Sequence, residues 1–256
     1  MTDANSGQRT TATGILYGSY VWIEFTLAML VAILAAIFVP GVERRRRCVA
    51  FCGRLSLRLA GISTVVRGLE KLPATDCVIV SNHASYIDGV LMQGFLPSRF
   101  SFVVKGEMQS FPIVNILLRR VGCRFVERFE ASGSARDARR LLKAASAGES
   151  LVVFPEGTFE ETPGLGRFRA GAFAAAVRAG VPVVPAVISG SRYILPAEKL
   201  LPRRGNLRID ILNPIAASHP AFANSKALAD LARQRILTVL DEPDLLPAAT
   251  ETKPTT

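Results

Sequence analysis

Residues 77–89 read CVIVSNHASYIDG, and this stretch decides the fold. Cys77–Val80 is continuously apolar and rich in β-branched residues, which is typical of a strand buried on both faces. A polar turn around Asn82 follows, and a helical pattern begins near Tyr86. A strand that passes through a short turn into a helix is the repeating unit of α/β proteins.

Similar units follow along the rest of the chain. Further strands are expected at Thr64–Val66, Phe100–Val104, Cys123–Val126, Leu151–Phe154, Val183–Ile188 and Leu207–Leu212, and helices at Ser134–Ala147, Arg169–Ala179 and Lys226–Leu240. Strands that alternate with helices predict an α/β fold with a mixed, largely parallel sheet flanked by helices. In such folds the chemistry collects at the carboxyl ends of the strands.

Charge and composition limit the classes of function. The chain has 31 Lys and Arg against 21 Asp and Glu, a formal net charge of +10, so its surface should attract phosphate, nucleic acid or anionic lipid. The arginines are scattered rather than interleaved with aromatic residues, which argues against a nucleic-acid partner. With 2 histidines a His-rich metal site is hard to build, so we expect no metal. No zinc-protease, P-loop, dinucleotide-binding or GxSxG string occurs.

An apolar segment near the N-terminus predicts membrane attachment. Val21–Val39 is apolar apart from Glu24 and Thr26, and as a helix it would measure roughly 28 Å, just enough to span a bilayer. Four arginines at 44–47 follow it directly. Such a cluster favours the cytoplasmic side, next to anionic headgroups. We therefore expect the inner (cytoplasmic) membrane, with the following domain on the cytoplasmic side.

The way this segment meets the bilayer has two readings. Val49–Val66 is a second apolar segment, and its Arg54 and Arg58 suit a helix that lies in the interface. The first segment could span the bilayer, or the two segments together could form a hairpin within one leaflet, where Glu24 is less costly to place. A cleaved signal peptide fits poorly, because the charge follows the apolar run. The expected organisation is a mobile N-terminus (1–20), a membrane-associated helical segment (21–62), the main domain (63–245) and a mobile tail (246–256).

His83 and Asp88 lie just past the carboxyl end of the Cys77–Val80 strand. A carboxylate one helical turn beyond a histidine can fix its tautomer and stabilise the imidazolium. This is the layout of a general base. In the plainer reading Asn82 caps the helix, His83 is exposed and Asp88 is an ordinary first-turn carboxylate.

Other polar residues lie at neighbouring strand ends. The Leu151–Phe154 strand breaks at Pro155 and delivers a carboxylate, a glycine and a hydroxyl, which can bind a polyol or shape a phosphate pocket. Two arginines precede the next helix N-terminus, where an anion is favoured, and one follows the Cys123–Val126 strand. These candidates are Glu156, Gly157 and Thr158, then Arg167 and Arg169, and Arg128. Each could equally belong to a solvated loop.

Taken together, these strings resemble the four blocks of the lysophosphatidate acyltransferase family of glycerolipid acyltransferases. The blocks are Asn82-His83-(four residues)-Asp88, Gly122-x-x-Phe125-x-x-Arg128, Phe154-Pro155-Glu156-Gly157-Thr158 and Val181-Pro182-Val183-Val184-Pro185. The resemblance covers roughly residues 60–215, and the N-terminal membrane segments fit it too. It implies a glycerol-3-phosphate acyltransferase-like fold preceded by membrane helices.

The resemblance also implies roles for single residues. His83 would deprotonate the acceptor hydroxyl with the support of Asp88, and Lys105 would lie near the phosphate or the acyl donor. The substrate-binding set would be Asn82, Lys105, Arg128, Glu156, Gly157, Thr158, Arg167 and Arg169. This chain departs from the family at Phe159, where arginine is usual. Either Arg167 or Arg169 substitutes for it, or the acceptor head is not a simple phosphomonoester, as in a lyso-ornithine lipid.

The expected function is that of a membrane-bound acyltransferase. It would move a fatty acyl group from acyl-CoA or acyl carrier protein to a lysophospholipid, first of all 1-acyl-sn-glycerol-3-phosphate to give phosphatidate, by direct attack. No cofactor is expected beyond this acyl-donor substrate, and acyl carrier protein is a possible partner. The alternatives are another lysolipid acceptor, a membrane-tethered lipid hydrolase in which His83 and Asp88 activate water, and a binding protein without chemistry.

Overall fold

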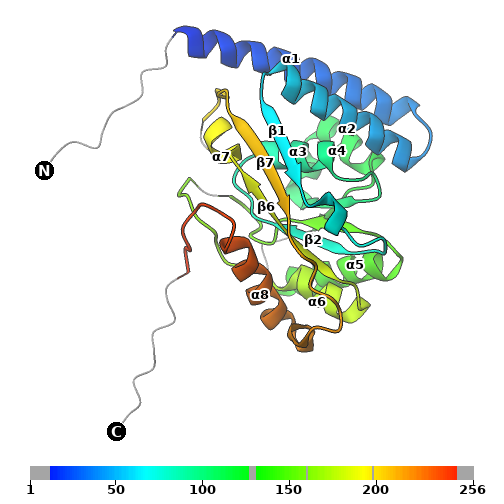
Figure 1. Cartoon of the computed structure of the whole chain (residues 1–256). Helices are drawn as coiled ribbons and strands as arrows, with labels where there is room; N and C mark the ends of the chain where they lie inside the picture. The colour runs from blue at the N-terminus through cyan, green and yellow to red at the C-terminus, as the bar shows by residue number, and fades with distance from the viewer. Residues whose placement is uncertain (1–11, 127–130, 160, 198, 247–256) are drawn as a thin grey trace, which may run out of the picture.

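The protein is described here by a computed structural model that covers residues 12–126, 131–159, 161–197 and 199–246. Within this part of the chain a seven-stranded sheet carries helices on both faces, and two long N-terminal helices lie across one side (Figure 1). The predicted α/β class is confirmed. Of the two terminal segments that we expected to be mobile, 1–20 and 246–256, residues 1–11 and 247–256 lie outside the described residues.

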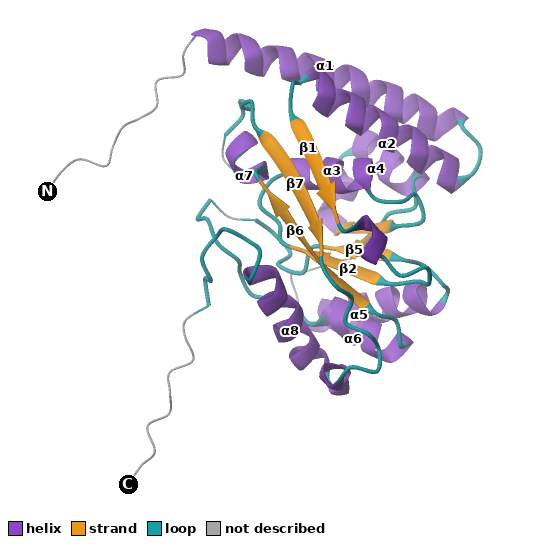
Figure 2. Cartoon of the chain, viewed as in Figure 1, coloured by secondary structure: helices purple, strands orange, loops and turns teal. Residues whose placement is uncertain are grey.

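All seven predicted strands are present. They are β1 (Ser63–Arg67), β2 (Val78–Ser81), β3 (Ser101–Lys105), β4 (Arg124–Val126), β5 (Leu151–Val153), β6 (Val183–Ser189) and β7 (Asn206–Ile211). Their order in the sheet is β1-β7-β6-β2-β5-β3-β4. Neighbours are parallel except β6 and β7. This confirms a mixed, largely parallel sheet (Figure 2).

The antiparallel pairing of β6 with β7 divides the strands by direction. β6, β2, β5, β3 and β4 run one way, and β1 and β7 run the other way. The amino ends of β1 and β7 therefore lie at the same edge of the sheet as the carboxyl ends of the other five strands. We call this edge, marked by Ser81 of β2 and Val153 of β5, the C-terminal edge.

Two cores lie on opposite faces of the sheet. On β2, Val78 and Val80 join one core and Ile79 joins the other, because successive side chains of a strand point to opposite faces. The helices of the first core are α5 (Ala131–Ser146), α6 (Gly171–Ala179) and α8 (Ser225–Leu237), and those of the second are α2 (Val42–Leu59) and α3 (Ile87–Phe95). The remaining short elements are α7 (Ser191–Ile194), η1 (Leu69–Lys71), η2 (Gly106–Ser110) and η3 (Pro220–Ala223).

The two N-terminal helices, α1 (Ala12–Phe38) and α2, form a hairpin (Figure 1). α1 begins earlier than the expected start at Val21. α2 ends at Leu59 rather than running on toward Val66, because Gly61 adopts a φ of 69° and turns the chain into β1. By length and composition alone, α1 could cross a membrane, since its mean hydropathy reaches 2.4 over 18 residues.

One side of α1 is covered by the rest of the protein. Ile33 and Ala36 pack against Leu117 and Val121, at the end of α4 (Pro112–Arg120). Glu24, the charge within the apolar run, accepts a hydrogen bond of 2.6 Å from Ser56 Oγ on α2. The opposite side of α1 exposes large apolar side chains, including Leu16, Ile23, Leu27, Leu30, Val31 and Leu34.

The sequence suggested that the arginines at 44–47 form one exposed basic block, but in the structure they do not. Arg46 is 8% exposed, and its guanidinium joins α2 to the main domain. It donates to the carbonyls of Val121 (2.8 Å), Ser98 and Arg99 (3.1 Å each) and to Ser101 Oγ (2.5 Å). Burial lowers the pKa of Arg46. Arg47 pairs with Glu43 at 2.7 Å on the surface. Part of the predicted headgroup cluster is therefore a structural contact.

Candidate active site

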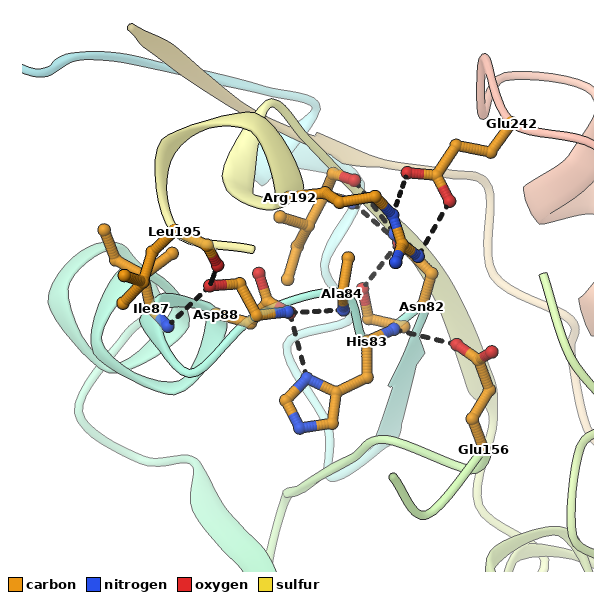
Figure 3. Close-up of polar contacts among 12 residues, drawn as sticks. Asn82, His83, Ala84, Ile87, Asp88, Glu156, Arg192, Leu195 and Glu242 are labelled. Carbon is orange, nitrogen blue, oxygen red and sulfur yellow. Dashed lines mark hydrogen bonds and ion pairs between the residues drawn. The ribbon is translucent and has the colours of Figure 1, made fainter. Parts of the chain in front are cut away.

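His83 and Asp88 form a close pair at the C-terminal edge (Figure 3). His83 Nδ1 lies 2.9 Å from Asp88 Oδ2, and the same oxygen accepts the backbone N–H groups of Ala84 (2.7 Å) and Ser85 (2.9 Å). With Nδ1–H donating to the Asp88 carboxylate oxygen, Nε2 is the nitrogen with the free lone pair and hence the basic one. The plainer reading, in which His83 is exposed, is wrong, because its side chain is 17% exposed and that of Asp88 is fully buried.

Aromatic rings cover the faces of the imidazole. Phe154 stacks on His83 with ring centroids 4.3 Å apart and planes 17° apart, and Phe159 meets the ring edge-on at 4.6 Å. Tyr86 in turn packs edge-on against Phe159 at 4.7 Å. The imidazole of His83 therefore lies in an apolar slot.

Glu156 connects the turn of His83 with the β5 exit. Its Oε1 accepts the backbone N–H of His83 at 2.8 Å (Figure 3). Its Oε2 accepts that of Gly166 at 2.8 Å. Burial raises the pKa of Glu156, and the two N–H bonds offset this in part. We had predicted a substrate ligand at this position. Both carboxylate oxygens are engaged with the protein's own backbone, and the substrate-binding role stays a prediction.

Asn82 is also engaged with the backbone. Its Nδ2 donates to the carbonyl of Ile188 at 2.9 Å, and its Oδ1 accepts the N–H of Ile188 at 2.8 Å. The residue is 3% exposed. The amide therefore joins the exits of β2 and β6, and the substrate-binding role expected from the sequence stays a prediction.

The other predicted site residues lie around this centre. Gly157 is buried with a φ of 87°, which favours glycine, while Thr158 beside it is exposed. Arg167 and Arg169 are exposed, and Lys105 is half-buried at the end of β3. Arg128 lies outside the described residues.

A small, mostly apolar hollow lies beside these groups, on the face of the sheet that carries α5, α6 and α8. Its lining includes Phe154, Pro155, Gly157 and Arg169 at the C-terminal edge, with Ala172 from the first turn of α6. The backbone N–H of Arg169 also donates to the carbonyl of Pro155 at 2.9 Å. The structure therefore brings Gly157 and Arg169 together. In the part of the chain described, no group of three or more His, Cys, Asp and Glu could hold a metal ion.

A clamp from the C-terminal segment holds the loop that carries Gly166, and sequence reasoning missed it. Glu242 forms a two-point pair with Arg192 at 2.9 and 3.0 Å and accepts the N–H of Gly164 at 2.8 Å. Arg233 donates to the carbonyls of Leu165 and Gly166, at 2.7 Å each. This loop supplies one of the two N–H groups that Glu156 accepts, so the clamp holds that N–H group in place.

Comparisons with known proteins identify what this arrangement resembles. Residues 63–189 match the model of the acyltransferase family. The chain is 33% identical over 177 residues to a chloroplastic 1-acyl-sn-glycerol-3-phosphate acyltransferase of Brassica napus, covering 68% of this chain and 49% of that protein. It is 30% identical over 186 residues to the human 1-acyl-sn-glycerol-3-phosphate acyltransferase beta, covering 70% of this chain and 65% of that protein.

Among solved structures, the 1-acyl-sn-glycerophosphate acyltransferase of Thermotoga maritima superposes with a TM-score of 0.71 at 22% identity. The match covers 88% of this chain and 95% of that one, which supports the fold. The chain spans about half the length of the two plant relatives, from Brassica napus and Arabidopsis thaliana (49% each).

Proposed function

Because the chain belongs to the acyltransferase family, alongside 1-acyl-sn-glycerol-3-phosphate acyltransferases, we propose that it acylates a lysophospholipid. The acyl group comes from a thioester, and the first candidate acceptor is 1-acyl-sn-glycerol-3-phosphate, which would become phosphatidate. The observation that carries this proposal is the pair of His83 and Asp88, with Nε2 as the basic nitrogen in an apolar slot.

In the proposed reaction, His83 Nε2 takes the proton of the acceptor hydroxyl as its oxygen attacks the thioester carbonyl. The resulting tetrahedral intermediate expels the thiolate, and the imidazolium then gives its proton to that thiolate. Asp88 holds the ring and stabilises its charged form. A positioned base of this kind contributes on the order of 10² to 10⁴ in rate, so positioning and electrostatics must supply the rest.

The acceptor's charged head would be bound by the exposed groups around the centre. Arg169 borders the hollow beside Gly157, and Thr158 and Arg167 lie exposed near it. Lys105, at the end of a neighbouring strand, is placed for the phosphate or the donor. Both acyl-CoA and acyl carrier protein are anionic, and the chain's net charge of +10 favours either. Arg128 keeps the role implied by its block, as a prediction.

We assign the α1–α2 hairpin to the cytoplasmic leaflet of the inner membrane. One side of α1 packs on α2 and α4, so a span surrounded by lipid would have to break the contacts of Ile33, Ala36 and Glu24. A helix that lies in the interface keeps them and buries its outer apolar side. Tyr17 of α1 donates to the carbonyl of Ala60 at 2.8 Å, just ahead of the amino end of β1. α1 therefore reaches the C-terminal edge, where a lipid acceptor would meet His83.

A second acceptor class is favoured by Phe159. The ring of Phe159 contacts both His83 and Tyr86 and forms an apolar wall beside the proposed base. A side chain that binds a phosphate at this position would have to carry a positive charge. An acceptor without a phosphomonoester head, such as a lyso-ornithine lipid, fits that wall better. The same ring counts against a lipid hydrolase, because a hydrolase must admit water beside the base.

The test is acyl transfer by the purified full-length protein to a panel of lysolipids, with one labelled acyl chain supplied as acyl-CoA or as acyl carrier protein. Acylated lipid is expected, with little free fatty acid. His83→Ala should abolish transfer while the circular dichroism spectrum stays unchanged. If more than a few per cent of the activity survives in His83→Ala, His83 is not the base. If free fatty acid is the main product, the protein is a hydrolase.

A further inference from the structure

We propose that Arg233, a buried residue of α8, is a positioning residue for His83 and acts through the loop ahead of α6 and through Glu156. The inference rests on the proposed function, because it gives Arg233 a part in the same reaction. It predicts that a residue of the C-terminal clamp sets the rate of acyl transfer as well as the stability of the fold.

Arg233 holds one peptide group of the loop by its oxygen. Its side chain is 7% exposed, and Nη2 donates to the carbonyl of Leu165 at 2.7 Å. Nε donates to the next carbonyl, that of Gly166, at 2.7 Å. Asp244 pairs with the same guanidinium, with Oδ2 3.0 Å from Nη1. Because a guanidinium presents its donors in a rigid fork, these contacts fix the loop in one orientation.

The same peptide group meets Glu156 at its other end. The carbonyl of Leu165 and the N–H of Gly166 belong to one planar unit, and this N–H donates to Glu156 Oε2 at 2.8 Å. A rotation of the unit would break the bonds of Arg233 and Glu156 together. The approach is close, since a Cβ at Gly166 would lie 3.1 Å from Glu156 Oε2. The orientation that Arg233 imposes is therefore passed to the carboxylate.

Glu156 passes this orientation to the turn of His83. Its Oε1 accepts the backbone N–H of His83 at 2.8 Å. Burial raises the pKa of Glu156, and the N–H bonds from Gly166 and His83 oppose this rise. A carboxylate that lost the Gly166 N–H would therefore be harder to keep ionised and in place. Asp88 holds the same turn through two further N–H groups, so the loss of Arg233 should misplace His83 rather than release it.

A purely structural role is the alternative, because a buried arginine that binds carbonyls stabilises a fold wherever it lies. Arg46 is such a case in the same chain. It is 8% exposed and donates to three backbone carbonyls, but it joins α2 to the amino end of β3, at the edge of the sheet opposite the C-terminal edge. Arg46→Met is therefore the matched control for Arg233→Met, since both remove a buried fork of donors.

The first measurement needs no substrate and uses the chain's 2 histidines, His83 and His219. Full-length protein with isotope-labelled histidine, in detergent micelles, gives one imidazole NMR signal for each, and His83→Ala assigns them. The His83 signal should change its chemical shift in Arg233→Met and in Glu156→Gln, and it should stay in place in Arg46→Met. His219, whose Nδ1 accepts a backbone N–H on η3, is the internal reference.

A second variant tests the same route without removing the arginine. In Gly166→Ala the added Cβ would crowd Glu156 Oε2. This variant should also shift the His83 signal, and it keeps the proposal testable if Arg233→Met does not fold.

The second measurement is acyl transfer to a short-chain, water-soluble lysolipid, which removes any effect of membrane attachment. Arg233→Met should lower kcat on the order of tenfold and leave KM for the acceptor within about twofold, because a misplaced base slows transfer without weakening binding. In a Glu156→Gln background the same substitution should lower kcat less than about threefold, since the route is already broken. Arg46→Met should leave kcat within about twofold of wild type.

An unmoved His83 signal in Arg233→Met and Gly166→Ala overturns the proposal. Equal losses of kcat in the wild-type and Glu156→Gln backgrounds also overturn it, as do equal losses in Arg233→Met and Arg46→Met. A rise in KM with kcat unchanged would assign Arg233 to acceptor binding and overturn it as well. A protein whose His83 signal responds as expected but which acylates no lysolipid would refute the proposed function and leave Arg233 as the residue that positions His83.

Discussion

The backbone N–H of His83 donates to Glu156 Oε1 at 2.8 Å, so the proposed base and the β5 exit are joined through the protein's own backbone. The other carboxylate oxygen of Glu156 accepts the N–H of Gly166. One half-buried side chain thereby fixes the turn at His83 relative to the loop ahead of α6. We therefore propose that Glu156 positions this turn in the proposed mechanism, and its role as a ligand of the acceptor is the alternative.

Glu156→Gln should lower kcat by about 10- to 100-fold and leave KM for the acceptor within about twofold, because a glutamine can accept only one of the two N–H groups and opposes the other with its own donors. Steady-state kinetics with varied acceptor measure both constants. Glu161→Gln is the control, since Glu161 is an exposed carboxylate of the same loop. A rise in KM with kcat unchanged would return Glu156 to the role of substrate ligand.

The sheet and the central pair were predictable because their signals are local. Runs such as Val183–Ile188 are continuous in apolar residues and bounded by turns, and they became strands close to the expected bounds. The pairing of His83 with Asp88 depends on a spacing of five residues at a strand exit. One turn of chain can close such a contact whatever the rest of the fold does.

Features that depend on distant partners were not predictable. Arg192 and Glu242 are far apart in the chain, and no local sequence pattern indicates that they form a pair. Asn82 was assigned to the substrate by the family resemblance alone, and Glu156 also because a carboxylate at a strand exit can bind a polyol. Their partners are backbone groups of Ile188, His83 and Gly166, which carry no signature in the sequence. α4 was not among the helices expected from the sequence.

Phe159→Arg should change acceptor preference. The aromatic wall beside His83 would be replaced by a fork-shaped cation that suits a phosphomonoester. We expect the ratio of kcat/KM for 1-acyl-sn-glycerol-3-phosphate to kcat/KM for lyso-ornithine lipid to rise by about tenfold, or about 1.4 kcal/mol. Phe159→Leu is the matched variant, because it removes the ring without adding charge. An unchanged ratio in Phe159→Arg would mean that Phe159 does not contact the acceptor's head.

Arg46→Ala should destabilise the protein by about 3 kcal/mol, because it leaves buried carbonyls of the main domain without a donor. For a domain of this size that loss lowers Tm by roughly 6–12 °C. Thermal unfolding in mild detergent measures it. Arg47→Ala is the control, since the Arg47 side chain is 64% exposed and its pair with Glu43 should contribute little. Equal Tm values for the two variants would show that Arg46 does not hold α2 to the main domain.

The C-terminal clamp should depend on pH through Asp244. The hydrogen bond from Arg233 lowers the pKa of Asp244 below its ordinary value of 3.8. The stability that comes from this lowered pKa is fully present above the pKa of the unfolded chain, and it is lost as the pH falls through the folded pKa. Asp244→Asn lacks it at every pH. At pH 7 the variant should therefore melt below wild type, by at most about 2 °C because water screens the half-exposed carboxylate, and the difference should shrink below about pH 4. Asp230→Asn is the control, because Asp230 pairs with Lys226 on an exposed face of α8 and should lose little. A Tm difference that stays constant from pH 7 into the acid range would contradict a charged pair of Arg233 and Asp244. The stability lost in Asp244→Asn would then come from packing and not from charge.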